Sequence, residues 1–162
     1  MRSQWNPSKT QVSAKNNVVT AMHPLAAEAG SHILRSGGNA VDAAVAAAFA
    51  VGVAEPWSSG IGGGGYAVVA GQSGADVIAF PMQSPALAKP ERYPLDGREP
   101  IGSFLWPGVV DDANLIGWSA MAIPGAVAGL ELLHQRHQQV RHEGIVGVVQ
   151  MAVALDLAPA AT

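Results

Sequence analysis

The stretch from residue 58 to residue 65 has the spacing most suggestive of chemistry. Its glycines at positions 60, 62 and 65 follow the Gly-x-Gly-x-x-Gly pattern that cradles a pyrophosphate in dinucleotide-binding domains. That use requires a strand before the loop and a helix N-terminus after it. The surrounding sequence predicts a helix before and a strand after, which favours close passage of two backbones over nucleotide binding. We define the glycine loop as Ser58, Ser59, Gly60, Gly62, Gly63, Gly64 and Gly65.

The histidines give a second set of candidates. His134 and His137 lie three residues apart on a predicted helix, with His142 nearby, a spacing that can ligate a metal. No carboxylate is placed beside them, so the pattern favours a solvated polar helix end, and we predict no metal site. His23 directly precedes Pro24, and a histidine that closes a turn into a helix is more often structural than catalytic.

The remaining acid–base and hydroxyl candidates are isolated. Glu55 and the pair Asp111 and Asp112 lie in predicted loops, where carboxylates are usually solvated. Ser58 and Ser59 lack the Gly-x-Ser-x-Gly setting of a nucleophile elbow. The residues alone therefore predict a globular α/β domain with a glycine-rich loop and no complete active site.

Composition narrows the possible functions. The 162 residues include no cysteine, which excludes disulfides, thiolate metal sites and a cysteine nucleophile. Twelve acidic and nine basic side chains give a net charge of −3, which argues against nucleic-acid binding. Hydrophobic residues make up 49% and charged residues 13%, so we expect some of the apolar surface to be covered by another chain or segment.

The N-terminal region predicts no export signal. Residues 1–16 are polar and are expected to form a disordered leader without the apolar stretch of a signal peptide. The longest apolar run, residues 43–54, is shorter than the roughly 20 residues of a membrane span. We therefore predict no membrane span and, by default, a cytoplasmic location.

The first half of the chain predicts one strand and two helices. Residues 18–22 are short and apolar, as in a buried strand. Pro24 favours the first turn of a helix that ends near the glycines at 37 and 38. Asn39 and Asp42 resemble a helix-start cap. The next helix, residues 40–53, is apolar on every face and is expected to be central and closely packed.

The second half predicts a hairpin, an irregular segment and a third helix. Residues 66–70 and 77–80 alternate as two strands around a turn at 71–74. Prolines and glycines recur over residues 81–118, which predicts an extended segment crossing the surface. Pro124 is expected to open a helix whose apolar face contains Val127, Leu130 and Leu133. The apolar tail, residues 144–162, is predicted to be helical and shows no stop signal, so the chain is expected to be incomplete.

Three segments together resemble a known family. The run from His23 to Tyr66, HPLAAEAGSHILRSGGNAVDAAVAAAFAVGVAEPWSSGIGGGGY, is similar to the start of the large subunit of γ-glutamyltranspeptidases (glutathione hydrolases). The string from Ala122 to Leu130, AIPGAVAGL, is similar to a later Val-Pro-Gly string of the same family. The resemblance covers residues 18–133 and fades after His134.

The resemblance implies a fold and a chemistry. The fold class is α+β, a partial αββα sandwich of the N-terminal nucleophile hydrolases, with residues 17–162 as the front portion of the large subunit. Family members cleave themselves, and the new N-terminal Thr of the small subunit attacks a γ-glutamyl or related acyl amide, with its own α-amine as base. We therefore expect no catalytic residue in this chain, no cofactor, a small-subunit partner that carries the Thr, and a small-molecule substrate.

One departure from the family pattern bears on specificity. Family members follow the second strand with Arg-Glu-x-Ala-Pro, whose Arg pairs with the α-carboxylate of the glutamyl group. Here Pro81 stands at that position, and the pocket candidates become Pro81, Met82 and Gln83. Because proline has no charge and no donor, either the acyl group lacks this carboxylate or a residue such as Arg92 or Arg98 replaces the missing Arg.

Two further hypotheses stay open beside the enzymatic one, nucleotide binding at the glycine loop and a non-catalytic role. The chain could be a truncated, non-catalytic family member that acts as a fragment or binding module, in which case no partner would restore activity. The location is equally undecided, because members of this family are often periplasmic or extracellular although this sequence shows no signal peptide.

Overall fold

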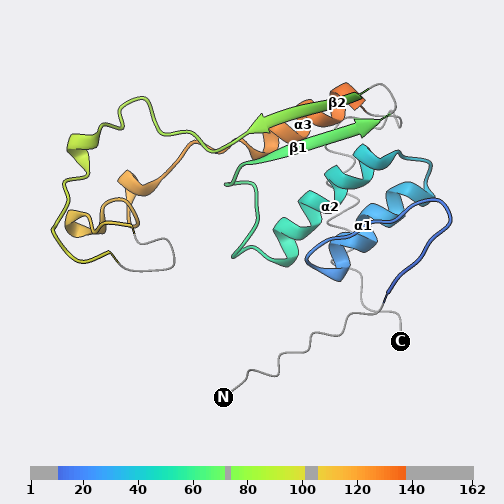
Figure 1. The fold of residues 1–162 in the computed structure, drawn as a ribbon, viewed down its shortest axis with the longest axis horizontal. Coiled ribbons are helices and arrows are strands. Elements are labelled where there is room, and N and C mark those ends of the chain that lie inside the picture. Colours follow the sequence, from blue (N-terminus) through green and yellow to red (C-terminus); the bar gives the residue numbers. More distant parts are fainter. Residues whose placement is uncertain (1–10, 72–73, 101–105, 138–162) are drawn as a thin grey trace, which may run out of the picture. The chain divides into compact units, whose positions relative to one another are not determined.

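The computed structural model describes residues 11–71, 74–100 and 106–137. The chain divides into two compact units, of which the described part of the first ends at Ala54 and the second spans Glu55–His137. Figure 1 shows the elements in chain order, and the units are described separately below. The predictions for residues 1–10, for the apolar tail and for His142 lie outside the described residues.

The first unit is a pair of packed helices, α1 (Pro24–Arg35) and α2 (Ala40–Ala54). They lie side by side in Figure 1 and contact each other along their lengths. Small residues permit this approach: Ala26, Ala29 and Ala50 are at most 2% exposed. At Gly30, a Cβ atom would lie only 2.9 Å from the carbonyl oxygen of Ala43. The contact is therefore built on alanine and glycine, in which little side-chain entropy is lost on packing.

Reciprocal hydrogen bonds begin α2, as the sequence predicts. The side-chain oxygen of Asn39 accepts from the amides of Val41 and Asp42, at 2.8 and 2.9 Å. In return, the Asp42 carboxylate accepts from the Asn39 amide at 2.9 Å. This is a capping box in which aspartate takes the place of the usual glutamate. The first turn of α2 is thus fixed by hydrogen bonds among its own first residues.

Two predictions for this unit are wrong. Residues 18–22 form no strand: the chain there is extended, and Val19 packs against α1 at Gly30. A strand needs a hydrogen-bonding neighbour, and in the described residues β1 and β2 pair only with each other. Helix α2 is also not buried all round, because Ala44 and Val53 are exposed.

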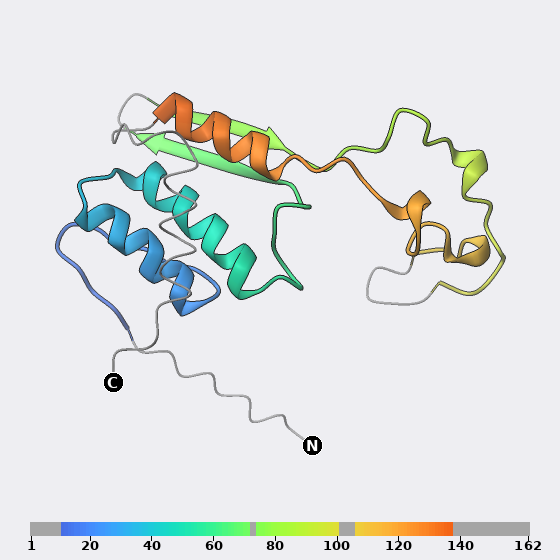
Figure 2. The ribbon, with the colours of Figure 1, turned by 180° about the vertical axis from the view of Figure 1, so that it is seen from behind.

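The second unit contains the predicted hairpin. Strands β1 (Gly65–Gly71) and β2 (Gly74–Phe80) pair antiparallel, with Gly65 opposite Phe80 and Val68 opposite Val77. Helix α3 (Ala126–His137) covers one face of this sheet, as the view from behind shows (Figure 2). The two views agree that the helix runs along the hairpin. The predicted turn centre, residues 72 and 73, lies outside the described residues.

Helix α3 begins later than predicted and turns a different face inward. It starts at Ala126 rather than Pro124, because the main chain at positions 123–125 is engaged elsewhere, as shown below. Leu133 is buried as predicted, whereas Val127 is 43% exposed. Gly129 and His134 are buried instead. The contact of Gly129 with Phe80 sets this face, since a Cβ at position 129 would lie 2.0 Å from the Phe80 ring.

Between the hairpin and α3, residues 84–122 form a long excursion that we call the arm. Its described part has no strand of its own and three short 3-10 turns, η1 (Pro90–Arg92), η2 (Val110–Asp112) and η3 (Trp118–Ala120). An isolated bridge between Leu95 and Val109 ties its middle together. This agrees with the extended, surface-crossing segment predicted from the sequence.

None of the helices in the described part of the chain is long and apolar enough to span a membrane.

Candidate functional site

The glycine loop, the exit of β2 and the start of α3 converge at one point, which we call the glycine junction. At Gly64, a Cβ atom would lie 2.5 Å from the Met82 amide nitrogen and 2.6 Å from the Phe80 carbonyl oxygen. Real Cβ atoms do not approach backbone so closely. Glycine is therefore required at position 64 for space, because two backbones pass close together there.

The glycine loop also caps α3. The carbonyl oxygen of Gly63 accepts hydrogen bonds from the amides of Gly125 and Ala126, both at 3.0 Å. A Cβ at Gly125 would lie 2.4 Å from the Phe80 carbonyl oxygen, so the helix start and the end of β2 are pressed together. The Gly63 carbonyl oxygen thus accepts hydrogen bonds from amides at the start of α3, as the Asn39 side chain does at the start of α2.

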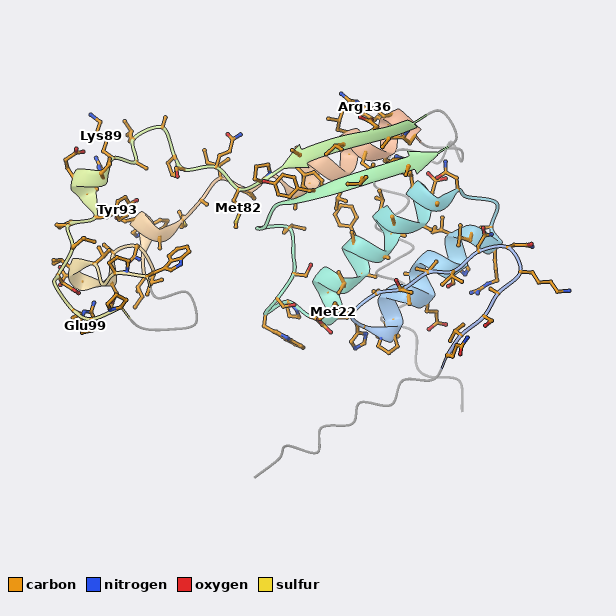
Figure 3. All side chains as sticks on the ribbon, in the orientation of Figure 1. Met22, Met82, Lys89, Tyr93, Glu99 and Arg136 are labelled. Carbon is orange, nitrogen blue, oxygen red and sulfur yellow. The ribbon has the colours of Figure 1, made fainter. Side chains whose placement is uncertain are left out.

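The pocket candidates lie at this junction. Gln83 and Ile123 form an antiparallel bridge, with the Gln83 amide donating to Ile123 at 3.0 Å and the Ile123 amide donating to Gln83 at 2.8 Å. Pro81, Met82 and Gln83 are all exposed. Figure 3 places Met82 at the neck where the arm leaves the hairpin. The structure thus brings the three candidates together with the glycine loop.

The two serines of the loop make only local contacts. The amides of Ser58 and Ser59 both donate to the Glu55 carbonyl at 3.0 Å, and the Ser58 hydroxyl approaches the Glu55 carboxylate at 3.4 Å. This closes a turn after α2. The loop lies between α2 and β1, so no helix N-terminus follows it and the arrangement of a dinucleotide-binding loop is absent at this position.

The histidines have structural positions. His23 caps α1 through Nδ1, which accepts from the Leu25 amide at 3.2 Å, in agreement with its predicted structural role. The prediction of a solvated helix end is wrong for His134, which is 2% exposed because α3 turns it toward the hairpin. His137 pairs with Asp76 of β2 at 2.9 Å. The described residues contain no group of three potential metal ligands.

The Asp76 carboxylate joins the end of α3 to β2. The His137 hydrogen bond is the main reason why the pKa of Asp76 lies below its ordinary value of 3.8, and the charge of Arg136 lowers it further. Arg136 approaches the same oxygen at 3.5 Å. Sequence reasoning missed this pairing, because Asp76 and His137 are brought together only by the packing of α3 on the hairpin.

The side chain of Arg98 binds three residues of the arm. Its guanidinium pairs with Asp96, donates to Asp112 at 2.6 Å and donates to the Val109 carbonyl at 3.2 Å. The hydrogen bond to Asp112 is the main reason why the pKa of Arg98 is raised, and the amide of Arg98 is the main reason why that of Asp96 is lowered. Figure 3 shows its neighbour Glu99 far along the arm from Met82.

The remaining acidic and basic candidates lie on the arm. Asp111 and Asp112 both have positive φ, 57° and 51°. The Asp112 carboxylate forms an ion pair with Arg98. Arg92 ends the short turn η1 and is exposed. None of these residues is part of the glycine junction.

The comparisons with known proteins identify the family. A family model described as gamma-glutamyltranspeptidase matches residues 26–155. The chain belongs to the γ-glutamyltranspeptidase family. The match begins later than the resemblance predicted from motifs and continues well beyond residue 133, so the prediction that it fades there is wrong.

Curated and solved relatives agree with this assignment. Glutathione hydrolase 3 of Arabidopsis thaliana is 39% identical over 121 residues, which are 74% of this chain and 17% of that protein. The acylase ACY 1 proenzyme of Pseudomonas sp. (strain SE83) is 40% identical over 122 residues, 75% of this chain and 21% of that protein. The crystal structure of Helicobacter pylori γ-glutamyltranspeptidase matches with a TM-score of 0.69 and 30% identity, covering 90% of this chain and 39% of that one.

These matches define both the fold and its extent. The chain spans about a fifth of the length of the curated relatives it matches. Helices and an antiparallel hairpin make its described part a piece of the α+β N-terminal nucleophile hydrolase fold of γ-glutamyltranspeptidases, as predicted. Two contributions to the glycine junction were not visible in the sequence, the Gly63 carbonyl and the bridge from Ile123. In the sequence, only the AIPG string that precedes α3 indicates these two contributions.

Proposed function

We propose that this chain is the front portion of a γ-glutamyltransferase-like amide hydrolase, which transfers or hydrolyses a γ-glutamyl or related acyl group. The nucleophile is the N-terminal Thr of a partner chain formed from one precursor. This chain is inactive alone and supplies one wall of the acyl pocket, through Pro81, Met82 and Gln83. The observation that carries the proposal is the glycine junction, which holds these three exposed residues in place.

The acyl group of this enzyme lacks the free α-carboxylate of γ-glutamyl substrates. Pro81 offers no charge and no donor to a carboxylate. The guanidinium of Arg98 already donates hydrogen bonds to Asp96, Asp112 and the Val109 carbonyl. A relative named as an acylase is as similar to this chain as one named as a glutathione hydrolase, which supports a broader acyl class.

The first test is whether a Thr-headed partner exists. Protein purified from its native source is analysed by intact mass and N-terminal sequencing, and its activity is assayed by release of p-nitroaniline from acyl p-nitroanilides. We expect a co-purifying chain that begins with Thr, and turnover. A single inactive species without such a chain would contradict the enzyme and favour a non-catalytic binding module.

The second test concerns the carboxylate. γ-Glutamyl p-nitroanilide is compared with its α-carboxamide analogue, which differs only in replacing the carboxylate with a neutral amide. The parent enzyme is expected to prefer the analogue, and P81R to shift the kcat/KM ratio toward γ-glutamyl by about tenfold or more, because hydrogen bonds to charged groups are worth about 1.5–3 kcal/mol. A parent preference for the γ-glutamyl substrate would contradict this specificity.

A further inference from the structure

Two main-chain hydrogen bonds hold Gln83 in place. Both hydrogen bonds of the bridge join it to Ile123, at 3.0 and 2.8 Å. The preceding residues are held as tightly, because the Gly64 and Gly125 positions leave no room for a side chain against Phe80, Pro81 and Met82. Gln83 therefore starts from a rigid backbone, which limits where its amide can reach.

The side chain of Gln83 is exposed and free. Its carboxamide makes no hydrogen bond or ion pair with any residue that the structure describes. Gln135, another of the described glutamines, differs, since its side chain donates to Glu131 at 2.6 Å on the surface of α3. An amide carries two donors and an acceptor with two lone pairs, so Gln83 retains its full capacity for a ligand.

The bridge also fixes which neighbours share the face of Gln83. Residues directly opposite in an antiparallel bridge point to the same face, as do residues two apart along one extended segment. Ile123 and Pro81 therefore share the face of Gln83. This face combines two apolar side chains, one of them the 52% exposed Ile123, with a single neutral hydrogen-bonding group.

We propose that Gln83 is the specificity-determining residue of the acyl pocket and that its carboxamide hydrogen-bonds an uncharged polar group on the acyl chain. The inference rests on the proposed function and deepens it by naming the substrate class: acyl amides that carry a carboxamide or hydroxyl group where γ-glutamyl substrates carry the α-carboxylate. Pro81 and Ile123 contact the methylene part of the chain. A neutral amide matches a neutral polar group better than it matches a carboxylate, which a bidentate Arg would bind.

The test compares three p-nitroanilides in the processed enzyme with its partner chain. The acyl groups are γ-glutamyl, its α-carboxamide analogue, and butanoyl, which has no polar group. The parent is expected to favour the carboxamide over the butanoyl substrate. In Q83L, which replaces the carboxamide with an apolar side chain one atom shorter, this preference in kcat/KM is expected to fall about fivefold.

Two further variants serve as controls for the Q83L experiment. Q135L makes the same change at a surface glutamine of α3 and should leave the ratio of the two substrates unaltered. Q83E keeps the shape of the side chain, and its charge should depress turnover of the γ-glutamyl substrate beyond that of the carboxamide.

The outcomes separate the two proposals. An unchanged carboxamide-to-butanoyl ratio in Q83L, or a parent that favours butanoyl, would overturn the role of Gln83 while leaving an active amide hydrolase. Absence of turnover of all three substrates by the processed parent would overturn the proposed function, and the inference with it.

Discussion

The helix pair and the arm are held together by different forces. In the helix pair, Ile33 and Val45 are at most 1% exposed, and small residues let α1 and α2 pack closely. In the arm, Leu115, Ile116 and Trp118 are 70% exposed or more. Its described part is held by polar links instead: the Arg98 ion pairs, the bridge at Leu95, and a 2.8 Å hydrogen bond from the Tyr93 hydroxyl to Ser119.

This contrast indicates which substitutions should change the stability of the chain and which should change its substrate specificity. Burial of apolar side chains contributes most of the stability of a domain, whereas exposed ion pairs contribute little. Substitutions in the helix pair should therefore change the free energy of unfolding. Substitutions in the arm should change its local order without unfolding the chain. Because the arm begins next to Gln83, they should also affect the proposed acyl pocket.

The largest expected effect tests the comparison directly. Ile33→Ala removes a side chain that is 1% exposed, and Leu115→Ala removes one that is 70% exposed. We expect Ile33→Ala to lower the free energy of unfolding by about 2–5 kcal/mol, and Leu115→Ala to change it by less than about 0.5 kcal/mol. Denaturant unfolding of the full chain measures both. Equal effects would mean that the arm has a buried core comparable to that of the helices.

The second prediction concerns the contact that seats α3 on the hairpin. Gly129→Ala would place a Cβ 2.0 Å from Cγ of Phe80, which forces the helix away from β2. We expect a loss of about 1–3 kcal/mol in unfolding free energy, as for other overpacked cores. Gly71→Ala is the matched control, because nothing lies within 4 Å of a Cβ there.

A double variant sharpens this prediction. Phe80→Leu shortens the ring that the new methyl group meets, so the loss caused by Gly129→Ala should be smaller in the Phe80→Leu background. Strictly additive losses would show that the two residues do not meet as the structure has them.

Local patterns in the sequence predicted the elements well, whereas the junction needed the three-dimensional structure. Asn39 and Asp42 identify the start of α2 because a cap depends only on residues three apart. The bridge between Gln83 and Ile123 joins residues forty apart, and no local period encodes it. His134 looked solvated because its sequence neighbours are polar, yet it is 2% exposed because of tertiary packing that its neighbours in sequence do not encode.

The third prediction concerns Arg98, whose removal should loosen the arm alone. Arg98→Ala frees two carboxylates and the Val109 carbonyl, so limited proteolysis within residues 84–122 should become several-fold faster. The unfolding midpoint of the whole chain should stay nearly constant, because exposed ion pairs contribute little. Arg98→Lys should rescue only in part, since an ammonium group cannot serve three partners in a fork.

Arg92→Ala is the control for this experiment. Its side chain is exposed on the same arm and makes no ion pair with the described residues. Equal acceleration of proteolysis in both variants would mean that loss of any arginine, rather than loss of the Arg98 links, opens the arm.

The smallest expected effect is a pH dependence of the contact between α3 and β2. The His137 hydrogen bond holds the pKa of Asp76 below its ordinary value of 3.8. A carboxyl group whose pKa is lowered by folding stabilises the folded state above its unfolded pKa and loses that contribution as the pH falls through the folded pKa. Unfolding midpoints measured between about pH 5 and pH 2 should therefore decline less steeply in Asp76→Asn than in the parent. Because the pair is exposed, about 1 M salt should reduce the difference. Identical slopes for parent and variant would show that Asp76 does not hold the end of α3 in solution.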